Sequence, residues 1–305
     1  MKLASPFSTA ATKAPADDRP RDAELDLFGL THPGRVRTEN QDQYVLCTVH
    51  PQVVVHGTSL PDPESFAGRS ERLATIMLVA DGVGGSVAGS RASRLAAEAV
   101  TRYVSSALRS YNAGGASSER EFMKALREAA LGAHDTVRAE AAAEPAERGM
   151  ATTLCLAVVV WPWMYVVQVG DSRCYFFLQG KLWQITRDQT MAQALVDQGV
   201  LSRDDARASP LSQVLASAIG AEELTPEITR VSVRERGCVI LVCTDGLTKH
   251  VSDPEIATAL AGMRSAEQVC RDLLELALDR GGSDNVTLVV GRALKKSNDP
   301  PAVPV

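Results

Sequence analysis

Five aspartates of this chain lie at the ends of short strand-like runs: Asp42, Asp81, Asp171, Asp245 and Asp284. Carboxylates at strand ends can meet in space although they are far apart in sequence. Several ionised carboxylates packed together repel one another and lose hydration, so they need a cation. Because an all-oxygen ligand set suits Mg²⁺ or Mn²⁺, these aspartates predict a centre that holds more than one hard divalent ion.

Each of these motifs is weak when taken alone. Asp81-Gly82 and Asp245-Gly246 are also typical of tight turns. Arg37, in a polar loop, is by itself typical of a solvated arginine. The glycine spacing between Gly84 and Gly89 does not continue into the Lys-Ser/Thr pair of a phosphate-binding P-loop, so that motif is excluded.

The composition is that of an ordinary globular protein. The chain has 305 residues, 45% hydrophobic and 23% charged residues, and a formal net charge of -5. The acidic balance argues against a nucleic-acid partner, and no run approaches the roughly 20 apolar residues that span a bilayer. The six cysteines form no C-x-x-C pair, which favours buried reduced thiols in a cytoplasmic protein. We expect a monomer.

The elements that must position the aspartates follow from hydrophobic periodicity. Strands are expected at 25–30, 43–48, 75–80, 152–160, 164–169, 174–178, 239–243 and 286–290. Helices are expected at 86–108, 120–142 and 265–278, and two weaker ones at 191–198 and 202–208.

Strands joined by hairpins, with helices in separate blocks, predict an α+β fold rather than a doubly wound parallel sheet. Residues 1–24 are expected to form a disordered tail, residues 25–294 one domain, and residues 295–305 a short second tail. A polar segment at about 186–226 is predicted to be an insertion over one end of the sheets. The role of residues 51–72 is left open.

As an ordered set, the motifs resemble the metal-dependent type 2C (PPM) family of Ser/Thr protein phosphatases, in its bacterial form. The matching segments are GRVRTENQD (34–42), VADGVGG (79–85), MATTL (150–154), VGDSR (169–173), CTDGLT (243–248) and GSDNVT (282–287). The resemblance covers about residues 25–292. It implies a four-layer α-β-β-α sandwich of two antiparallel sheets flanked by helices, with a flap insertion and with the metals at one end.

The resemblance also assigns roles to single residues. Asp81 would bridge two ions, one of which also binds the Gly82 carbonyl, while Asp245 and Asp284 would bind the other. Asp171, together with Asp245, would hold a third, weaker ion. The expected catalytic residues are Arg37, Asp42 and Asp81, with Arg37 binding the substrate phosphate. A glycine at position 82, 84 or 85 would let the backbone approach the ions and adopt a positive φ.

Three positions depart from the family pattern. Gln41 stands where many members have Glu, which removes one acidic group near the ions. Val83 stands where eukaryotic members often have a histidine, so the proton for the leaving group must come from elsewhere. Gln189 stands in the flap where many bacterial members have a histidine, which leaves the substrate choice open.

We therefore expect hydrolysis of phosphoserine and phosphothreonine in proteins by a water that two, or three, Mn²⁺ or Mg²⁺ ions activate. Partners would be phosphorylated proteins, including Ser/Thr kinases and their substrates. One alternative substrate is an anti-sigma-factor antagonist in a partner-switching pathway. A second alternative is an inactive member that only binds a phosphoprotein; the retained aspartates argue against it.

Overall fold

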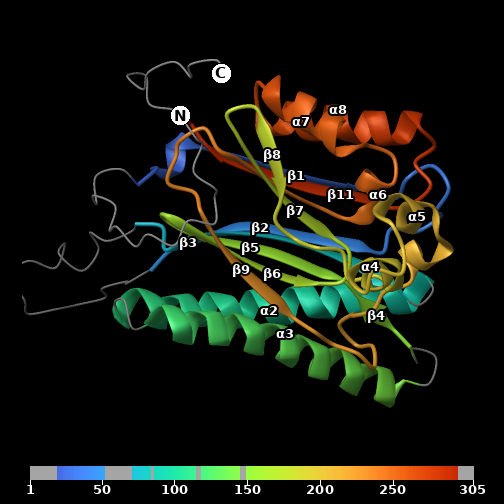
Figure 1. The fold of residues 1–305 in the computed structure, drawn as a ribbon. Helices are drawn as coiled ribbons and strands as arrows, with labels where there is room; N and C mark the ends of the chain where they lie inside the picture. The colour runs from blue at the N-terminus through green and yellow to red at the C-terminus, as the bar shows by residue number, and fades with distance from the viewer. Residues whose placement is uncertain (1–18, 52–70, 84–85, 115–117, 145–148, 295–305) are drawn as a thin grey trace, which may run out of the picture.

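The protein is a stack of two antiparallel sheets with helices covering both outer faces (Figure 1). The computed structural model describes residues 19–51, 71–83, 86–114, 118–144 and 149–294. The first sheet contains, in spatial order, β1 (Leu25–His32), β11 (Val286–Ala293), β10 (Val239–Cys243), β7 (Arg173–Leu178) and β8 (Lys181–Gln184). The second contains β2 (Asp42–Val49), β3 (Ala74–Val83), β5 (Leu154–Val160), β6 (Trp163–Val169) and β9 (Glu227–Ser232), with β4 (Ala151–Thr152) paired to β3.

Apolar side chains fill the three spaces between these four layers. Helices α2 (Ser86–Gly114) and α3 (Ser118–Ala143) pack on the second sheet, and α7 (Asp253–Ala261) and α8 (Ala266–Asp279) pack on the first. A third buried cluster lies between the sheets. Strand β3 is covered on both faces, which explains why it is apolar at every position from Ile76 to Ala80.

Short polar residues begin several helices. The Ser265 hydroxyl accepts a hydrogen bond from the Gln268 backbone N–H at the start of α8. At the start of α7, Ser252 and Glu255 form a reciprocal capping box. Such caps satisfy backbone donors that have no partner within the helix, and each stabilises its helix by about 1 kcal/mol.

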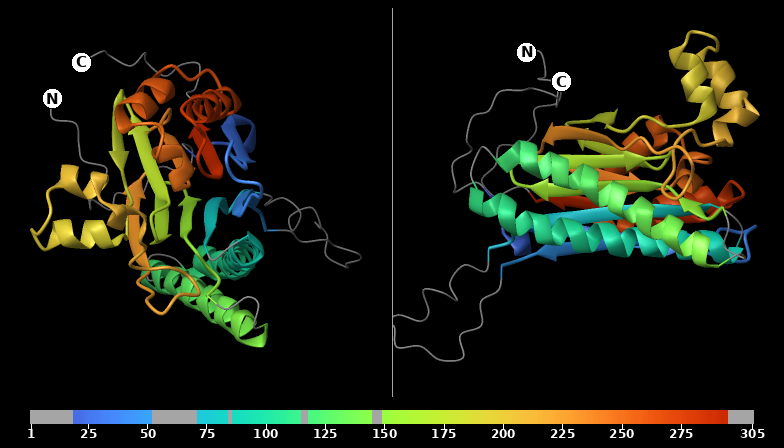
Figure 2. Two further views of the ribbon diagram at one scale, coloured as in Figure 1. Left: turned by 90° about the vertical axis from the view of Figure 1, so that its right-hand side faces the viewer. Right: turned by 90° about the horizontal axis from the view of Figure 1, so that it is seen from below.

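The flap lies between β8 and β9 and projects from the side of the sandwich (Figure 2). It contains α4 (Met191–Asp197), α5 (Arg203–Ala208) and the short turn η5 (Pro210–Gln213). Gln189 anchors its first residues: its amide oxygen accepts from Gly170 N at 2.9 Å and its amide nitrogen donates to the Thr225 carbonyl at 3.0 Å. The departure at Gln189 is thus a buried anchor in which both amide atoms have partners.

The predicted fold class is confirmed, and the predicted strands and helices lie within a few residues of their observed positions. Strands β8 and β9 and helix α7 were missed, although the Ser252-x-x-Glu255 pattern is a helix-start signal. Residues 1–18 of the expected tail at 1–24, the expected tail at 295–305, most of segment 51–72, and Gly84 and Gly85 lie outside the described residues. Residues 19–24 of the expected tail at 1–24 are described, and there the buried Arg72 donates to the Pro20 carbonyl at 2.8 Å.

Within the described part of the chain, no helix combines the length and the apolar character that crossing a membrane requires. All six cysteines lie among the described residues and are free thiols.

Candidate metal centre

Strand ends from both sheets meet at one end of the sandwich and line a cleft of about 640 Å³. Six of the seven predicted site residues line it: Arg37, Asp81, Gly82, Asp171, Asp245 and Asp284. Val83 also lines the cleft and is 44% exposed. The seventh, Asp42, is buried behind the cleft wall.

Asp81 lies at the end of β3 and lines the cleft. Its backbone is fixed at the end of β3, where its N–H donates to the Thr153 hydroxyl at 3.0 Å and its carbonyl accepts from the Thr152 hydroxyl at 2.8 Å. Burial, followed by the nearby Asp42 and Asp245 carboxylates, raises the pKa of Asp81 well above its usual range. A cation in the cleft would therefore stabilise the ionised form of Asp81.

Asp42 is only 2% exposed and lies between the two sheets. Its Oδ2 accepts hydrogen bonds from the hydroxyls of Thr244, at 2.8 Å, and Thr287, at 2.6 Å. Its Oδ1 is buried and has no hydrogen-bond partner. Burial raises the pKa of Asp42 to about 7, although both threonine hydroxyls act in the opposite direction.

Gly82 is required because of a close backbone approach. A Cβ at this position would lie 2.2 Å from the Gly89 carbonyl oxygen in the first turn of α2 and 2.9 Å from the Gln41 carbonyl oxygen. Gly82 is not among the described residues with positive φ, so the expectation of a left-handed backbone there is wrong. The first turn of α2 occupies the space that a side chain at position 82 would need.

Asp245 and Asp284 face two basic side chains in this structure. Lys249 Nζ lies 2.7 Å from Asp245 Oδ2 and 2.8 Å from Asp284 Oδ2. Arg37 forms a two-pronged pair with Asp284, with Nε–Oδ1 at 2.9 Å and Nη2–Oδ2 at 3.2 Å. Burial favours a protonated Asp284, but Lys249 and Arg37 outweigh it and lower its pKa below the usual value.

The pKa of Lys249 responds to the same contacts. Burial alone would lower it, but Asp245 and Asp284 outweigh burial and raise the pKa above its ordinary value. The ammonium group therefore stays charged. Sequence reasoning did not single out Lys249, although its position one helical turn after Asp245 was a readable signal.

Asp171 follows β6 and is 9% exposed. Burial, then the charges of Asp245 and Asp188, raise its pKa to about 8. The preceding Gly170 adopts φ +94°, and a Cβ there would lie 2.8 Å from the Thr153 side chain. This tight turn brings Asp171 to the cleft.

Asn285 positions the loop that carries Arg37. Its amide nitrogen donates to the carbonyls of Pro33, at 2.9 Å, and Glu39, at 2.8 Å, while its Oδ1 accepts from Gln41 N at 2.8 Å. Asn285 is 4% exposed, so these bonds are shielded from water. The loop is thereby tied to the residue that follows Asp284.

The donor set fits hard divalent ions. Asp245 Oδ1, like Asp42 Oδ1, is a buried carboxylate oxygen with no hydrogen-bond partner. Within the described residues, no three His, Cys, Asp or Glu side chains are close enough to chelate one ion by themselves. Mg²⁺ keeps several waters and needs one or two carboxylates. Asp81 with the Gly82 carbonyl, and Asp245 with Asp284, satisfy that requirement.

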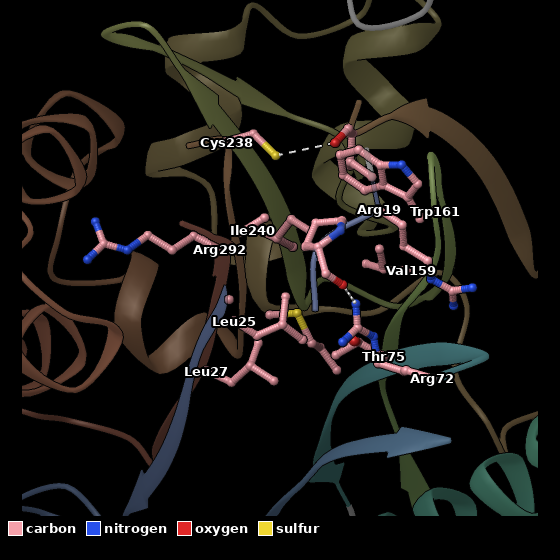
Figure 3. A pocket seen from close by; sticks show the side chains of 15 residues that line it. Arg19, Leu25, Leu27, Arg72, Thr75, Val159, Trp161, Cys238, Ile240 and Arg292 are labelled. Atoms are coloured by element: carbon pink, nitrogen blue, oxygen red, sulfur yellow. Dashed lines mark hydrogen bonds between the residues drawn. The ribbon is translucent and has the colours of Figure 1, made fainter. Parts of the chain in front are cut away.

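A second hollow lies at the opposite end of the sandwich, between the first residues of β3 and β10 (Figure 3). Its volume is about 40 Å³, its lining is mainly apolar, and Arg72 points to the Pro20 carbonyl within it. About one water fills such a space. The chemistry therefore belongs to the acidic cleft.

Comparisons with known proteins agree with this geometry. A sequence model described as "Protein phosphatase 2C" matches residues 58–285. The chain belongs to the protein phosphatase 2C family. The serine/threonine protein phosphatase PstP of Mycobacterium tuberculosis is 36% identical over 217 residues, which cover 71% of this chain and 40% of that protein. The serine/threonine phosphatase stp of Listeria welshimeri is 31% identical over 226 residues, which cover 73% of this chain and 87% of that protein.

Solved structures of the protein phosphatase 2C family show the same fold. The crystal structure of Mycobacterium tuberculosis PstP/Ppp superposes with a TM-score of 0.70 at 28% identity, over 89% of this chain and 99% of that one. A structure of the PstP catalytic domain in complex with two manganese ions has a TM-score of 0.65 at 28% identity. The match covers 89% of this chain and 99% of that one. The chain spans about 40% of the length of the mycobacterial protein.

The predicted family is confirmed. The enzyme class, protein serine/threonine phosphatase, stays a prediction. The roles assigned to single site residues stay predictions. Sequence reasoning missed the supporting residues Thr153, Thr244, Lys249 and Thr287, because each acts through a contact with a distant part of the chain.

Proposed function

We propose that this protein hydrolyses phosphoserine and phosphothreonine in phosphorylated proteins, with Mn²⁺ or Mg²⁺ in the acidic cleft. One ion would be held by Asp81 and the Gly82 carbonyl, and the other by Asp245 and Asp284. Asp171 and Asp245 would hold a third, weaker ion. The observation that carries the proposal is the convergence of four aspartates and Arg37 on one cleft. The manganese complex of PstP supports the choice of metal.

The ions, when bound, supply Lewis acidity that activates water and neutralises charge on the phosphoryl group. Arg37 binds two phosphate oxygens with its planar guanidinium, in the geometry that it now uses toward Asp284. Water attacks phosphorus, the bond from phosphorus to the serine or threonine oxygen breaks, and that oxygen takes up a proton.

The chain's own residues hold this arrangement in place. Thr152 and Thr153 fix the Asp81 backbone, and Asn285 fixes the Arg37 loop. Val83 presents no ionisable group to the leaving oxygen, so we propose that water delivers the proton. We also propose that the protein opposes Ser/Thr kinases in the cytoplasm; its six free thiols are typical of a reducing compartment.

Hydrolysis of p-nitrophenyl phosphate and of a phosphothreonine peptide tests the proposal. We expect activity with Mn²⁺ or Mg²⁺, much less with Ca²⁺, which prefers longer bonds and more ligands, and none in excess EDTA. Asp81→Ala and Asp245→Asn should each leave below a tenth of wild-type kcat at saturating metal. Asp279→Asn, an exposed carboxylate paired with Arg35, is the matched control and should keep full activity.

Two results contradict the proposal. Full turnover in excess EDTA rules out the metal mechanism. A folded wild-type protein that binds a phosphopeptide but never releases phosphate with any of these ions indicates the inactive binding protein instead.

A further inference from the structure

Lys249 stands at the centre of the two aspartates that are expected to hold the second ion. It directly follows α6 (Asp245–Thr248), and its side chain is 27% exposed within the cleft. Its ammonium group contacts Oδ2 of Asp245 and Oδ2 of Asp284 at 2.7 and 2.8 Å. One lysine therefore joins two carboxylates that lie 39 positions apart in the sequence.

The remaining cleft carboxylates lack such a partner. Among the described residues, neither Asp81 nor Asp171 has a basic side chain within ion-pair distance, whereas Asp245 and Asp284 do. The two halves of the cleft thus differ in direct ion pairing: Lys249 and Arg37 contact the Asp245–Asp284 half, and act on the Asp81 half only at longer range.

We propose that Lys249 is a tethered counter-ion that competes with the second divalent ion for Asp245 and Asp284. The inference rests on the proposed metal-dependent function. The ammonium group and an ion would use the same Oδ2 atoms, so Lys249 must move away before the ion binds. Strong metal affinity is then confined to the Asp81 half, and the second ion binds more weakly than its ligands alone would allow.

Arg37 is a weaker candidate for the counter-ion than Lys249. It touches Asp284 only, and its side chain is 56% exposed. Among the residues that the structure describes, Lys249 is the one basic side chain that contacts both carboxylates, and it is shielded enough from water for its charge to matter.

Titration of the metal-free, full-length protein with Mn²⁺ tests the proposal, with free Mn²⁺ followed by electron paramagnetic resonance and heat followed by calorimetry. Lys249→Met keeps the length of the side chain and removes its charge, and it should tighten the weaker Mn²⁺ site at least tenfold. Lys249→Arg keeps the charge and should stay within about threefold of wild type. Lys124→Met, at an exposed position on α3, should bind Mn²⁺ as wild type does.

Thermal unfolding provides a second readout that does not depend on activity. Metal-free Lys249→Met should unfold at a lower temperature than wild type, because Asp245 then loses the ammonium group that it contacts and repels Asp284 more strongly. Saturating Mn²⁺ should also raise the unfolding temperature of Lys249→Met more than it raises that of wild type. Circular dichroism confirms folding, and Lys249→Gln replaces the Met variant if that protein is poorly folded.

The possible failures are distinguishable. If wild type and Lys249→Met bind two Mn²⁺ ions with equal affinities, the counter-ion proposal is wrong and the proposed function stands. If Lys249→Met changes only the KM for phosphopeptide, Lys249 is a phosphate ligand and the proposal is also wrong. If neither protein binds Mn²⁺, both the proposed function and this inference fail.

Discussion

Asp42 in β2 lies directly opposite Asp81 in β3, in the antiparallel register of the second sheet. Asp81 faces the cleft, whereas Asp42 is buried and accepts hydrogen bonds from Thr287 in β11 of the other sheet and from Thr244, which directly follows β10. The carboxylate of Asp42 therefore joins the two sheets directly behind the candidate metal centre. Because Asp42 is buried, ionising its carboxylate costs free energy in the folded state.

The metal-free protein should lose stability as the pH rises from about 4 to about 7. Burial raises the folded-state pKa of Asp42 to about 7, above the ordinary aspartate pKa of 3.8, so the folded protein binds more protons than the unfolded chain in this range. Stability falls with pH wherever the folded state holds the extra proton. The measurement is the urea midpoint between pH 5 and 8. Asp42→Asn should reduce the slope without abolishing it, since Asp81 and Asp171 act in the same direction; an unchanged slope contradicts the argument.

Arg37→Ala should raise KM for a phosphothreonine peptide about 10- to 100-fold and change kcat less. A charged hydrogen bond contributes about 1.5–3 kcal/mol, and a phosphate contact already made in the ground state affects KM first. Steady-state kinetics at saturating Mn²⁺ measures this. Arg35→Ala is the control, because Arg35 pairs with the exposed Asp279 outside the cleft. A large loss of kcat with KM unchanged would place Arg37 on the transition state alone.

Gly82→Ala should destabilise the protein by about 1–3 kcal/mol and weaken Mn²⁺ binding. The new Cβ would meet the Gly89 carbonyl oxygen at 2.2 Å, so β3 and α2 must move apart. Gly132→Ala is the matched control: Gly132 lies in α3 with nothing within 4 Å of a new Cβ, and alanine should stabilise that helix by about 0.5–1 kcal/mol. Urea unfolding of both variants measures these changes in the free energy of unfolding. Equal stability of Gly82→Ala and wild type would refute the close approach.

Asn285→Ala should lower stability and raise KM in the same direction as Arg37→Ala, but by a smaller factor. It removes three shielded hydrogen bonds that hold the Arg37 loop, and leaves the backbone groups of Pro33, Glu39 and Gln41 without those partners. Asn285→Asp keeps the acceptor for Gln41 N but turns a buried carboxylate oxygen toward the Pro33 and Glu39 carbonyls, so its denaturant midpoint at neutral pH should lie below that of the alanine variant. A normal KM in a destabilised alanine variant would limit Asn285 to a purely structural role.

The sequence alone determined the local features of this protein. Apolar periodicity located α2, α3 and most strands, because a buried face imposes a repeat of 3.6 or 2 residues that can be read directly. The order of the aspartate motifs indicated the family and the cleft residues, since Asp81, Asp171 and Asp245 each lie close to the end of a recognisable strand. Strand β9 was not predicted, because it lies at the edge of its sheet, is only partly buried and is correspondingly polar in sequence.

Only the tertiary structure decided which distant groups meet. The position of Lys249 one turn after Asp245 is readable in the sequence, but its contact with Asp284 depends on how β10 and β11 pair. Likewise, Asp42 resembled the other cleft aspartates until the packing of the two sheets placed it under Thr244 and Thr287. Charge compensation and burial depend on neighbours contributed by the whole fold, and short-range patterns in a single chain carry no information about those neighbours.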